Sequence, residues 1–148
     1  MEMRISGVEN PVEGLQMLER IAVKTRSSCD FIDITADIKE LIDKSGVIDG
    51  ICVVFVTHTT AGVTINENAD PDVTRDILCG LEKMVPNRGD YRHAEGNSPA
   101  HIKTSMVGPS LTMIIEGGAP ILGTWQSVFF CEFDGPRTRS VCVKIIEG

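Results

Sequence analysis

The residues with the most evident chemical potential are the three histidines of the chain, His58, His93 and His101. Each lies in or beside a polar stretch rich in threonine, asparagine, serine, glycine or acidic residues, and none lies on the apolar face of a predicted helix. Imidazole is a common ligand of borderline metals and titrates near neutral pH. Three imidazoles could form a tripod with one open coordination position, as a catalytic metal requires. The sequence leaves two interpretations open: one shared catalytic or metal site, or three unrelated histidines that order loops.

His58 begins the stretch "HTTAGVTINENAD" (58–70), which contains two carboxylates, Glu67 and Asp70. These carboxylates are candidate catalytic groups, because a carboxylate can bind a metal or orient an imidazole. The alternatives are structural: Glu67 would face solvent on a strand, and Asp70 would cap the helix that begins at the following proline, which is the interpretation we favour. Hydroxyl and amide side chains in the same stretch are candidate substrate ligands: Thr59, Thr60 and Asn66.

The other two histidines lie in a locally basic segment of an acidic chain. Residues 88–103 contain three Lys or Arg side chains and two histidines against only two acidic side chains. This local excess of positive charge predicts an anion site, with a solvated loop as the alternative. The candidate substrate ligands in this segment are Arg92, Asn97 and Lys103.

A glycine pair and the only tryptophan lie in "GGAPILGTWQSV" (117–128). Gly117 and Gly118 could let a phosphate approach backbone N–H groups, although a tight turn between strands is the simpler interpretation. Trp125 is most simply a core residue, but its ring could also stack on a heteroaromatic substrate, with Gln126 as a polar contact beside it.

The elements that must position these residues follow from the hydrophobic pattern. Strand-like runs predict an α+β protein with a largely antiparallel sheet system in two layers, about seven or eight strands and two or three helices. We expect a helix over 35–46 that Thr35 caps and Gly46 ends, and a second helix from Asp70 to just before Pro86. Residues 87–110 are predicted to be mostly loop, with a helical turn over 99–107 as the alternative. The predicted strands are 18–26, 31–35, 51–57, 63–67, 111–116, 124–133 and 139–147.

Composition limits the class of protein. The 148 residues fit a single domain over 17–148, preceded by an extension over 1–16 that we expect to be flexible or loosely docked; Met17 is an alternative start. No apolar run is long enough for a membrane span, and the acidic N-terminus does not resemble a signal peptide, so we expect a cytoplasmic location and no membrane partner. Five cysteines without a CxxC spacing indicate neither a disulfide framework nor a zinc ribbon. A net charge of −7 argues against a nucleic-acid partner.

Four separated motifs together resemble the YjbQ-like family, sometimes labelled secondary thiamine-phosphate synthase. They are "VTHTTAGVTINENADPDV" (56–73), "YRHAEGNSPAHIKTSMVGPSLT" (91–112), the spacing from Ser110 through Gly118 to "GTWQ" (123–126), and "FDGPR" (133–137). The resemblance covers roughly residues 18–147. It implies a compact α+β fold that assembles as a homotrimer, and a pocket in which His58, His93 and His101 are metal-binding or catalytic groups.

The activity that the resemblance implies joins a pyrimidine-methyl diphosphate to a thiazole phosphate, with release of diphosphate. A leaving diphosphate needs a divalent cation, basic side chains or backbone N–H groups. The candidate ions are zinc, manganese and magnesium, but magnesium prefers oxygen ligands and three imidazoles suit the other ions better. The histidines therefore either bind such a cation or donate protons to the leaving group. Two alternative functions remain: a non-catalytic trimer that binds a metal or an anionic metabolite, and a metal-dependent phosphate-ester hydrolase.

Overall fold

The computed structural model describes residues 14–148, so the expectation of a flexible extension lies mostly outside the described residues. Along these residues the chain forms eight strands and three helices, as predicted. In chain order they are β1 (Gln16–Lys24), β2 (Asp30–Asp33), α1 (Thr35–Ser45), β3 (Gly50–Val56), β4 (Ala61–Glu67), α2 (Pro71–Met84), α3 (Ser98–Val107), β5 (Ser110–Glu116), β6 (Ala119–Pro120), β7 (Gln126–Glu132) and β8 (Thr138–Glu147). Within residues 14–148 no helix has the length and hydropathy of a membrane span.

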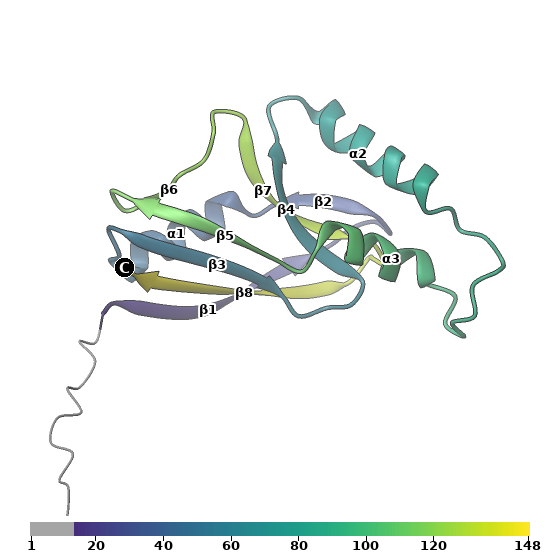
Figure 1. Cartoon of the computed structure of the whole chain (residues 1–148), viewed down its shortest axis with the longest axis horizontal. Coiled ribbons are helices and arrows are strands. Elements are labelled where there is room, and N and C mark those ends of the chain that lie inside the picture. Colours follow the sequence, from purple (N-terminus) through teal and green to yellow (C-terminus); the bar gives the residue numbers. More distant parts are fainter. Residues whose placement is uncertain (1–13) are drawn as a thin grey trace, which may run out of the picture.

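The strands form two antiparallel sheets (Figure 1). The five-stranded sheet has the order β1-β8-β3-β5-β6, and the three-stranded sheet has the order β2-β7-β4. Every strand pair is antiparallel. The predicted α+β class with antiparallel sheets is therefore confirmed.

The main core lies between the two sheets and α1. Side chains from β3, β5 and β8 meet the isoleucines of α1 and the inward face of β7, all with at most 4% of their surface exposed. A second cluster lies on the opposite face of β7, where Leu81 of α2 and Ala100 of α3 pack against Phe129 and Cys131. The helices α2 and α3 therefore add a third layer, and β7 is buried on both faces, as its nearly continuous apolar sequence requires.

The strand β8 carries the clearest alternation of the molecule. Arg139, Val141, Val143 and Ile145 are all buried, while the residues between them are only half-buried. Because side chains on a strand alternate between faces, Arg139 shares the inward face with three core residues. A charged group therefore enters the edge of the apolar core and needs a partner there.

Two local predictions were wrong. The segment 98–107 forms a full helix, since Pro99 occupies its first turn, Ala100, Lys103 and Thr104 are buried, and Gly108 at φ 98° ends it. Thr35 does not cap α1: its hydroxyl instead accepts the backbone N–H of Val128 on β7 at 2.8 Å. A buried hydroxyl satisfies a neighbouring strand here rather than its own helix.

The predicted boundaries of the other two helices are confirmed. Gly46 ends α1 in the left-handed region at φ 72°, a conformation that glycine adopts without steric cost. Asp70 caps α2, because its Oδ1 atom accepts the backbone N–H of Asp72 at 2.9 Å.

Replacement of this cap should destabilise the protein measurably. We expect Asp70→Ala to lower the free energy of unfolding by about 1 kcal/mol, because one N–H group of the first turn loses its acceptor. Urea unfolding followed by circular dichroism measures the change. Asp76→Ala, an exposed acidic residue in the middle of the same helix, is the matched control and should cause no comparable loss. Equal effects of the two substitutions would contradict the capping role.

Candidate active site

A buried carboxylate organises the end of the molecule where the two sheets meet. Glu132, at the end of β7, is fully buried, and Arg139 donates to it from Nη2 at 2.6 Å and from Nε at 2.8 Å. Thr25 donates its hydroxyl at 2.9 Å, and the backbone N–H groups of Phe133 and Asp134 donate at 3.0 and 2.9 Å. Burial raises the pKa of Glu132, but the arginine, the backbone and the threonine together hold it below its usual value. The carboxylate is therefore ionised and fully hydrogen-bonded.

The same guanidinium ties the loop after β3 to this network. Arg139 Nη2 also donates to the hydroxyl of Thr60 at 2.8 Å and to its carbonyl oxygen at 3.4 Å. Thr60 directly precedes β4, so one side chain of β8 fixes the entrance of a strand in the other sheet. The loop 57–60 that carries His58 is thereby held at its last residue, Thr60.

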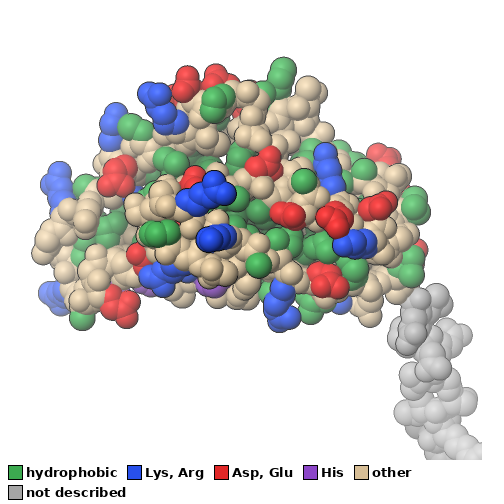
Figure 2. All heavy atoms as spheres, turned by 180° about the vertical axis from the view of Figure 1, so that it is seen from behind, with side chains coloured by type: hydrophobic (Ala, Val, Ile, Leu, Met, Phe, Trp, Pro, Cys, Tyr) green, Lys and Arg blue, Asp and Glu red, His purple; other side chains and the backbone are tan. Residues whose placement is uncertain are grey.

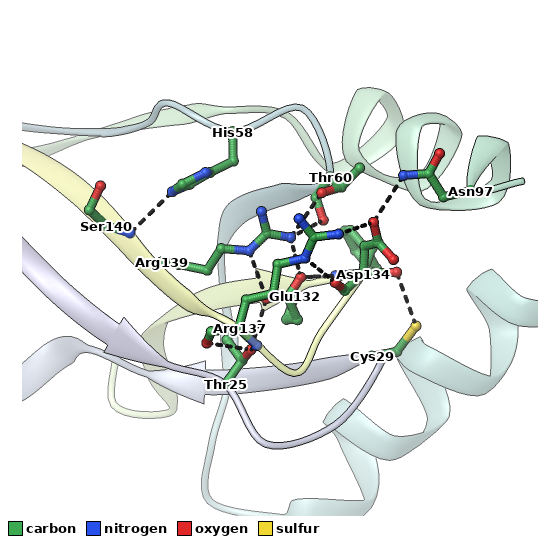
Figure 3. Close-up of polar contacts among 11 residues, drawn as sticks. Thr25, Cys29, His58, Thr60, Asn97, Glu132, Asp134, Arg137, Arg139 and Ser140 are labelled. Atoms are coloured by element: carbon green, nitrogen blue, oxygen red, sulfur yellow. Dashed lines mark hydrogen bonds and ion pairs between the residues drawn. The ribbon is translucent and has the colours of Figure 1, made fainter. Parts of the chain in front are cut away.

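His58 projects from this loop next to β8 (Figure 3). Because Val56 pairs with Val141, the chain that leaves β3 passes beside Ser140, whose backbone N–H donates to His58 Nε2 at 3.1 Å. An imidazole that accepts a hydrogen bond at Nε2 carries its proton on Nδ1. Burial and the positive charge of Arg139 lower the pKa of His58 below 6.5. His58 is therefore a neutral imidazole, and its Nδ1–H has no acceptor among residues 14–148.

The neutral state of His58 predicts a pH dependence of stability. Its folded pKa lies below the value of 6.5 in the unfolded chain, so the unfolded chain binds more protons between the two values. This contribution to stability is fully present above about pH 6.5 and is lost as the pH falls through the folded pKa. NMR titration of the imidazole should give a midpoint below 6.5, and His58→Gln should flatten the stability profile in that window. A midpoint above 6.5 would contradict the assignment.

A polar pocket of about 310 Å³ lies beside this network, and we call it the histidine–arginine pocket. The loop after β3, the start of α3 and the β7–β8 turn supply its lining: Thr57, His58, Thr59, Thr60, Glu95, Asn97, His101, Asp134, Arg137 and Arg139. The structure therefore brings together five side chains that the sequence singled out: His58, Thr59, Thr60, Asn97 and His101.

Two residues of the β7–β8 turn, Asp134 and Arg137, line this pocket and bind each other. Arg137 donates to Asp134 Oδ2 from Nη2 and to the Asp134 carbonyl oxygen from Nε, both at 2.8 Å. Asn97 donates from Nδ2 to the same Asp134 carboxylate at 2.9 Å. The other amide atom, Asn97 Oδ1, is buried and has no hydrogen-bond partner among residues 14–148. A side chain at Gly135 would collide with the backbone oxygen of Ser27, so the turn needs glycine there.

His93 lies next to this pocket rather than in it. Its ring packs edge-on against that of His101, with 5.3 Å between the ring centroids. The two rings line an adjoining hollow of about 420 Å³ together with Tyr91, Arg92, Ser98 and Ile102, and we call it the ring hollow. His101 is the residue that belongs to both spaces.

The positions of His58, His93 and His101 test the prediction that the three imidazoles bind one metal ion. Within residues 14–148 no group of three or more His, Cys, Asp or Glu side chains has the geometry to hold a metal ion. His58 Nε2 already accepts the Ser140 N–H group, so a metal could reach this imidazole only at Nδ1. The described residues of one chain therefore do not fit a three-histidine metal site.

Several other predicted site residues lie far from the histidines. Glu67 pairs with Gln126 at the end of β4 opposite to Thr60, and the seven residues of β4 span about 20 Å. Asn66 and the cap residue Asp70 lie at that same end. Trp125 is 61% exposed there, so the interpretation as a core residue was wrong. Its carbonyl oxygen accepts the N–H of Asn68 at 3.1 Å.

The glycine pair and Lys103 also have other roles. Gly117 and Gly118, with φ of 61° and 78°, form the turn between β5 and β6, as the simpler interpretation predicted. Lys103 is buried between helices and forms an ion pair with Glu82 at 2.6 Å. It lines a second hollow of about 210 Å³ with Cys29, which shares Asn97 and Asp134 with the histidine–arginine pocket but has no histidine in its lining.

The network residues were not predicted as site residues, although the sequence contains their signal. Glu132 interrupts the apolar run "VFFCEF", and it follows Val128 and Phe130 at even spacing. Arg139 has the same parity as Val141, Val143 and Ile145. Two opposite charges on the inward faces of adjacent strands in the chain predict a buried ion pair. The contribution of Ser140 through its backbone carries no sequence signal.

Figure 2 shows the distribution of charged side chains over one face of the molecule. Lys, Arg, Asp and Glu side chains are interspersed over this face, and histidine side chains are visible only at its lower margin. The surface there has no large area of one charge.

Comparison with known proteins agrees with this architecture. The family model described as "UPF0047 protein YjbQ-like" matches residues 19–148. The UPF0047 protein MJ1081 of Methanocaldococcus jannaschii is 53% identical over 132 residues, which cover 89% of this chain and 96% of that protein. YugU of Bacillus subtilis is 46% identical over 131 residues, covering 88% and 99%. A crystal structure of a YjbQ/UPF0047 protein from Clostridium acetobutylicum has a TM-score of 0.85 and 60% identity, covering 86% and 99%. The chain therefore belongs to the YjbQ-like UPF0047 family.

Proposed function

We propose that this protein is an enzyme that binds a small phosphorylated metabolite in the histidine–arginine pocket. The observation that carries the proposal is the convergence of His58, His101, Arg137 and Arg139 on one pocket of about 310 Å³. These residues come from three separate parts of the chain. Perturbed titratable groups that converge in a polar hollow are characteristic of catalytic sites.

The hydrogen-bond donors of the pocket suit a phosphoryl group. Arg137 has a side chain that is 53% exposed, and its Nη1 atom has no protein partner within residues 14–148. The Nδ1–H group of His58 and the exposed hydroxyls of Thr57 and Thr59 supply further donors. Guanidinium and hydroxyl groups are favoured ligands of phosphate oxygens. Arg139 holds the loop, because its Nε and Nη2 atoms donate to Glu132 and Thr60.

The reaction that we propose first is the joining of a pyrimidine-methyl diphosphate to a thiazole phosphate. The bond between the methylene carbon and the diphosphate oxygen breaks, and the thiazole nitrogen forms a new bond to that carbon. The nucleophile carries no proton, so the step needs no general base. It needs stabilisation of the negative charge that develops on the diphosphate.

The neutral form of His58 suits this requirement. A neutral imidazole donates a hydrogen bond to a developing oxyanion without adding a buried charge beside Arg139. Arg137 can neutralise the leaving diphosphate, and His101 is a candidate proton donor to it. The buried acceptor Asn97 Oδ1 can receive an N–H or O–H group of the substrate.

An assay with both substrates tests this proposal. The expected result is equimolar thiamine phosphate and diphosphate, measured by chromatography and phosphorus NMR. Parallel reactions with magnesium, manganese, zinc or a chelator show whether a divalent ion is needed. Release of phosphate from either substrate alone would instead identify a hydrolase, and tight binding of the substrates without product would identify a binding protein.

We also propose that the chain assembles as a homotrimer, as the family resemblance implies. The outer face of the five-stranded sheet supports this assembly, because Ile51 pairs with both Ile114 and Ile146 and all three side chains are exposed. Phe55, 45% exposed, lies on the same face of β3. Rows of exposed apolar side chains are typical of subunit interfaces. Light scattering should give three times the chain mass, and Ile51→Glu should lower it; a monomeric wild-type protein would contradict the proposal.

A further inference from the structure

The ring hollow differs in character from the polar pocket beside it. Its volume is about 420 Å³, and its lining is predominantly apolar and aromatic. It lies between the segment before α3 and the first turns of that helix. Apolar lining with a few polar groups is characteristic of a pocket for the organic part of a ligand.

The aromatic rings of the hollow are held in place by contacts of their own. His93 and His101 pack edge-on with their planes at 82°. The hydroxyl of Tyr91 donates to the carbonyl oxygen of Pro86 at 3.2 Å. Aromatic side chains fixed in this way present flat surfaces that favour stacked or edge-on contact with another ring.

His101 connects the two spaces, because its side chain lines both. A ligand with its phosphoryl group at Arg137 would have one face of His101 next to that group. Its organic part would then have the ring hollow as the adjoining apolar space. Trp125, the stacking candidate from the sequence, lies at the opposite end of β4 and cannot serve this position within one chain.

We propose that the ring hollow is a second subsite, which takes a planar aromatic or heteroaromatic ring carried by the phosphorylated ligand. This inference rests on the proposed function, since it needs the phosphoryl group in the histidine–arginine pocket. It assigns the flat ring of a phosphate or diphosphate ester to a defined place in the site. Ile102, which is 37% exposed on α3, supplies the apolar contact that is easiest to remove without disturbing the fold.

Calorimetric binding of three phosphate esters tests the subsite. Methyl phosphate probes the histidine–arginine pocket alone, phenyl phosphate adds a planar ring, and cyclohexyl phosphate adds a ring of similar size that is not planar. We expect phenyl phosphate to bind about tenfold more tightly than methyl phosphate, because the ring buries apolar area. We expect cyclohexyl phosphate to bind more weakly than phenyl phosphate, because it cannot stack.

Two isoleucine variants test whether the tighter binding of phenyl phosphate arises in the ring hollow. Ile102→Ser should remove most of the gain for phenyl phosphate and leave methyl phosphate binding unchanged. Ile121→Ser, at an exposed isoleucine after β6, should change neither. Equal binding of phenyl and methyl phosphate, a gain for cyclohexyl phosphate as large as for phenyl phosphate, or a gain that survives Ile102→Ser would overturn the inference.

The design separates failure of the subsite from failure of the proposed function. If methyl phosphate binds and Arg137→Ala abolishes that binding, the histidine–arginine pocket is supported whatever the ring does. If methyl phosphate does not bind the wild-type protein, or binds equally well to Arg137→Ala, the proposed function fails and this inference fails with it.

Discussion

Replacement of Glu132 by alanine should lower the free energy of unfolding by about 3–5 kcal/mol, because it leaves the guanidinium of Arg139 buried without its partner. The side chain of Arg139 is only 5% exposed, so water cannot replace the lost carboxylate. The backbone N–H of Asp134 also loses its acceptor, while the Thr25 hydroxyl and the Phe133 N–H each lose one of two acceptors. Equilibrium urea unfolding at neutral pH measures the difference.

Two further variants test whether the loss of stability comes from the unpaired buried charge of Arg139. Glu132→Leu combined with Arg139→Met should recover much of the loss, because apolar residues of similar volume can replace a buried ion pair. Glu40→Ala removes an exposed carboxylate that pairs only with Lys44 on the surface, and it should leave the unfolding midpoint almost unchanged. If Glu132→Ala is as mild as Glu40→Ala, the network does not stabilise the fold as described.

Replacement of His58 should have the largest effect on turnover. We expect His58→Ala to lower kcat by about 10²–10³-fold, the usual cost of removing one preorganised donor to a developing oxyanion. The backbone N–H of Ser140 also loses its acceptor, so stability must be measured alongside activity. Steady-state kinetics on the proposed substrates provides kcat and KM separately.

Other variants test whether this effect has the proposed cause. Arg137→Ala should mainly raise KM, because its guanidinium binds the phosphoryl group in both the ground and transition states. His93→Ala should have a smaller effect on kcat than His58→Ala, because His93 lines the ring hollow and not the histidine–arginine pocket. Lys39→Ala, at an exposed position of α1, is the control. Equal kcat in His58→Ala and wild type would rule out His58 as the catalytic donor.

The sequence predicted the strongly patterned elements well. The helix α2 has a capping aspartate, a proline in its first turn and a clear apolar face, so its limits could be read directly. The limits of helix α3 could not be predicted from its hydrophobic pattern, because polar Lys103 and Thr104 are buried while Ile102 and Met106 are exposed. Its apolar stripe is therefore obscured, and only packing against the sheet makes it a helix.

The sequence predicted which types of residue form the site, but it did not predict how these residues are arranged in space. His58 and Ser140 are 82 residues apart, and only the register between β3 and β8 places them in contact. The same register determines the tautomer of His58, which no local pattern indicates. Glu67 and Asn66 are close to His58 in sequence, yet the length of β4 places them at the far end of the sheet. Trp125, which precedes β7, lies at that same end because Gln126 pairs with Glu67.

The most direct test of the central claim is NMR mapping of inorganic diphosphate on the isotope-labelled protein. We expect saturable shifts of backbone amides around the histidine–arginine pocket, at Thr59, Thr60, His101 and Ser140, and their loss in Arg137→Ala. Saturable shifts centred instead on the Cys29–Lys103 hollow or on the Gly117–Gly118 turn would contradict it. So would the absence of any saturable shift.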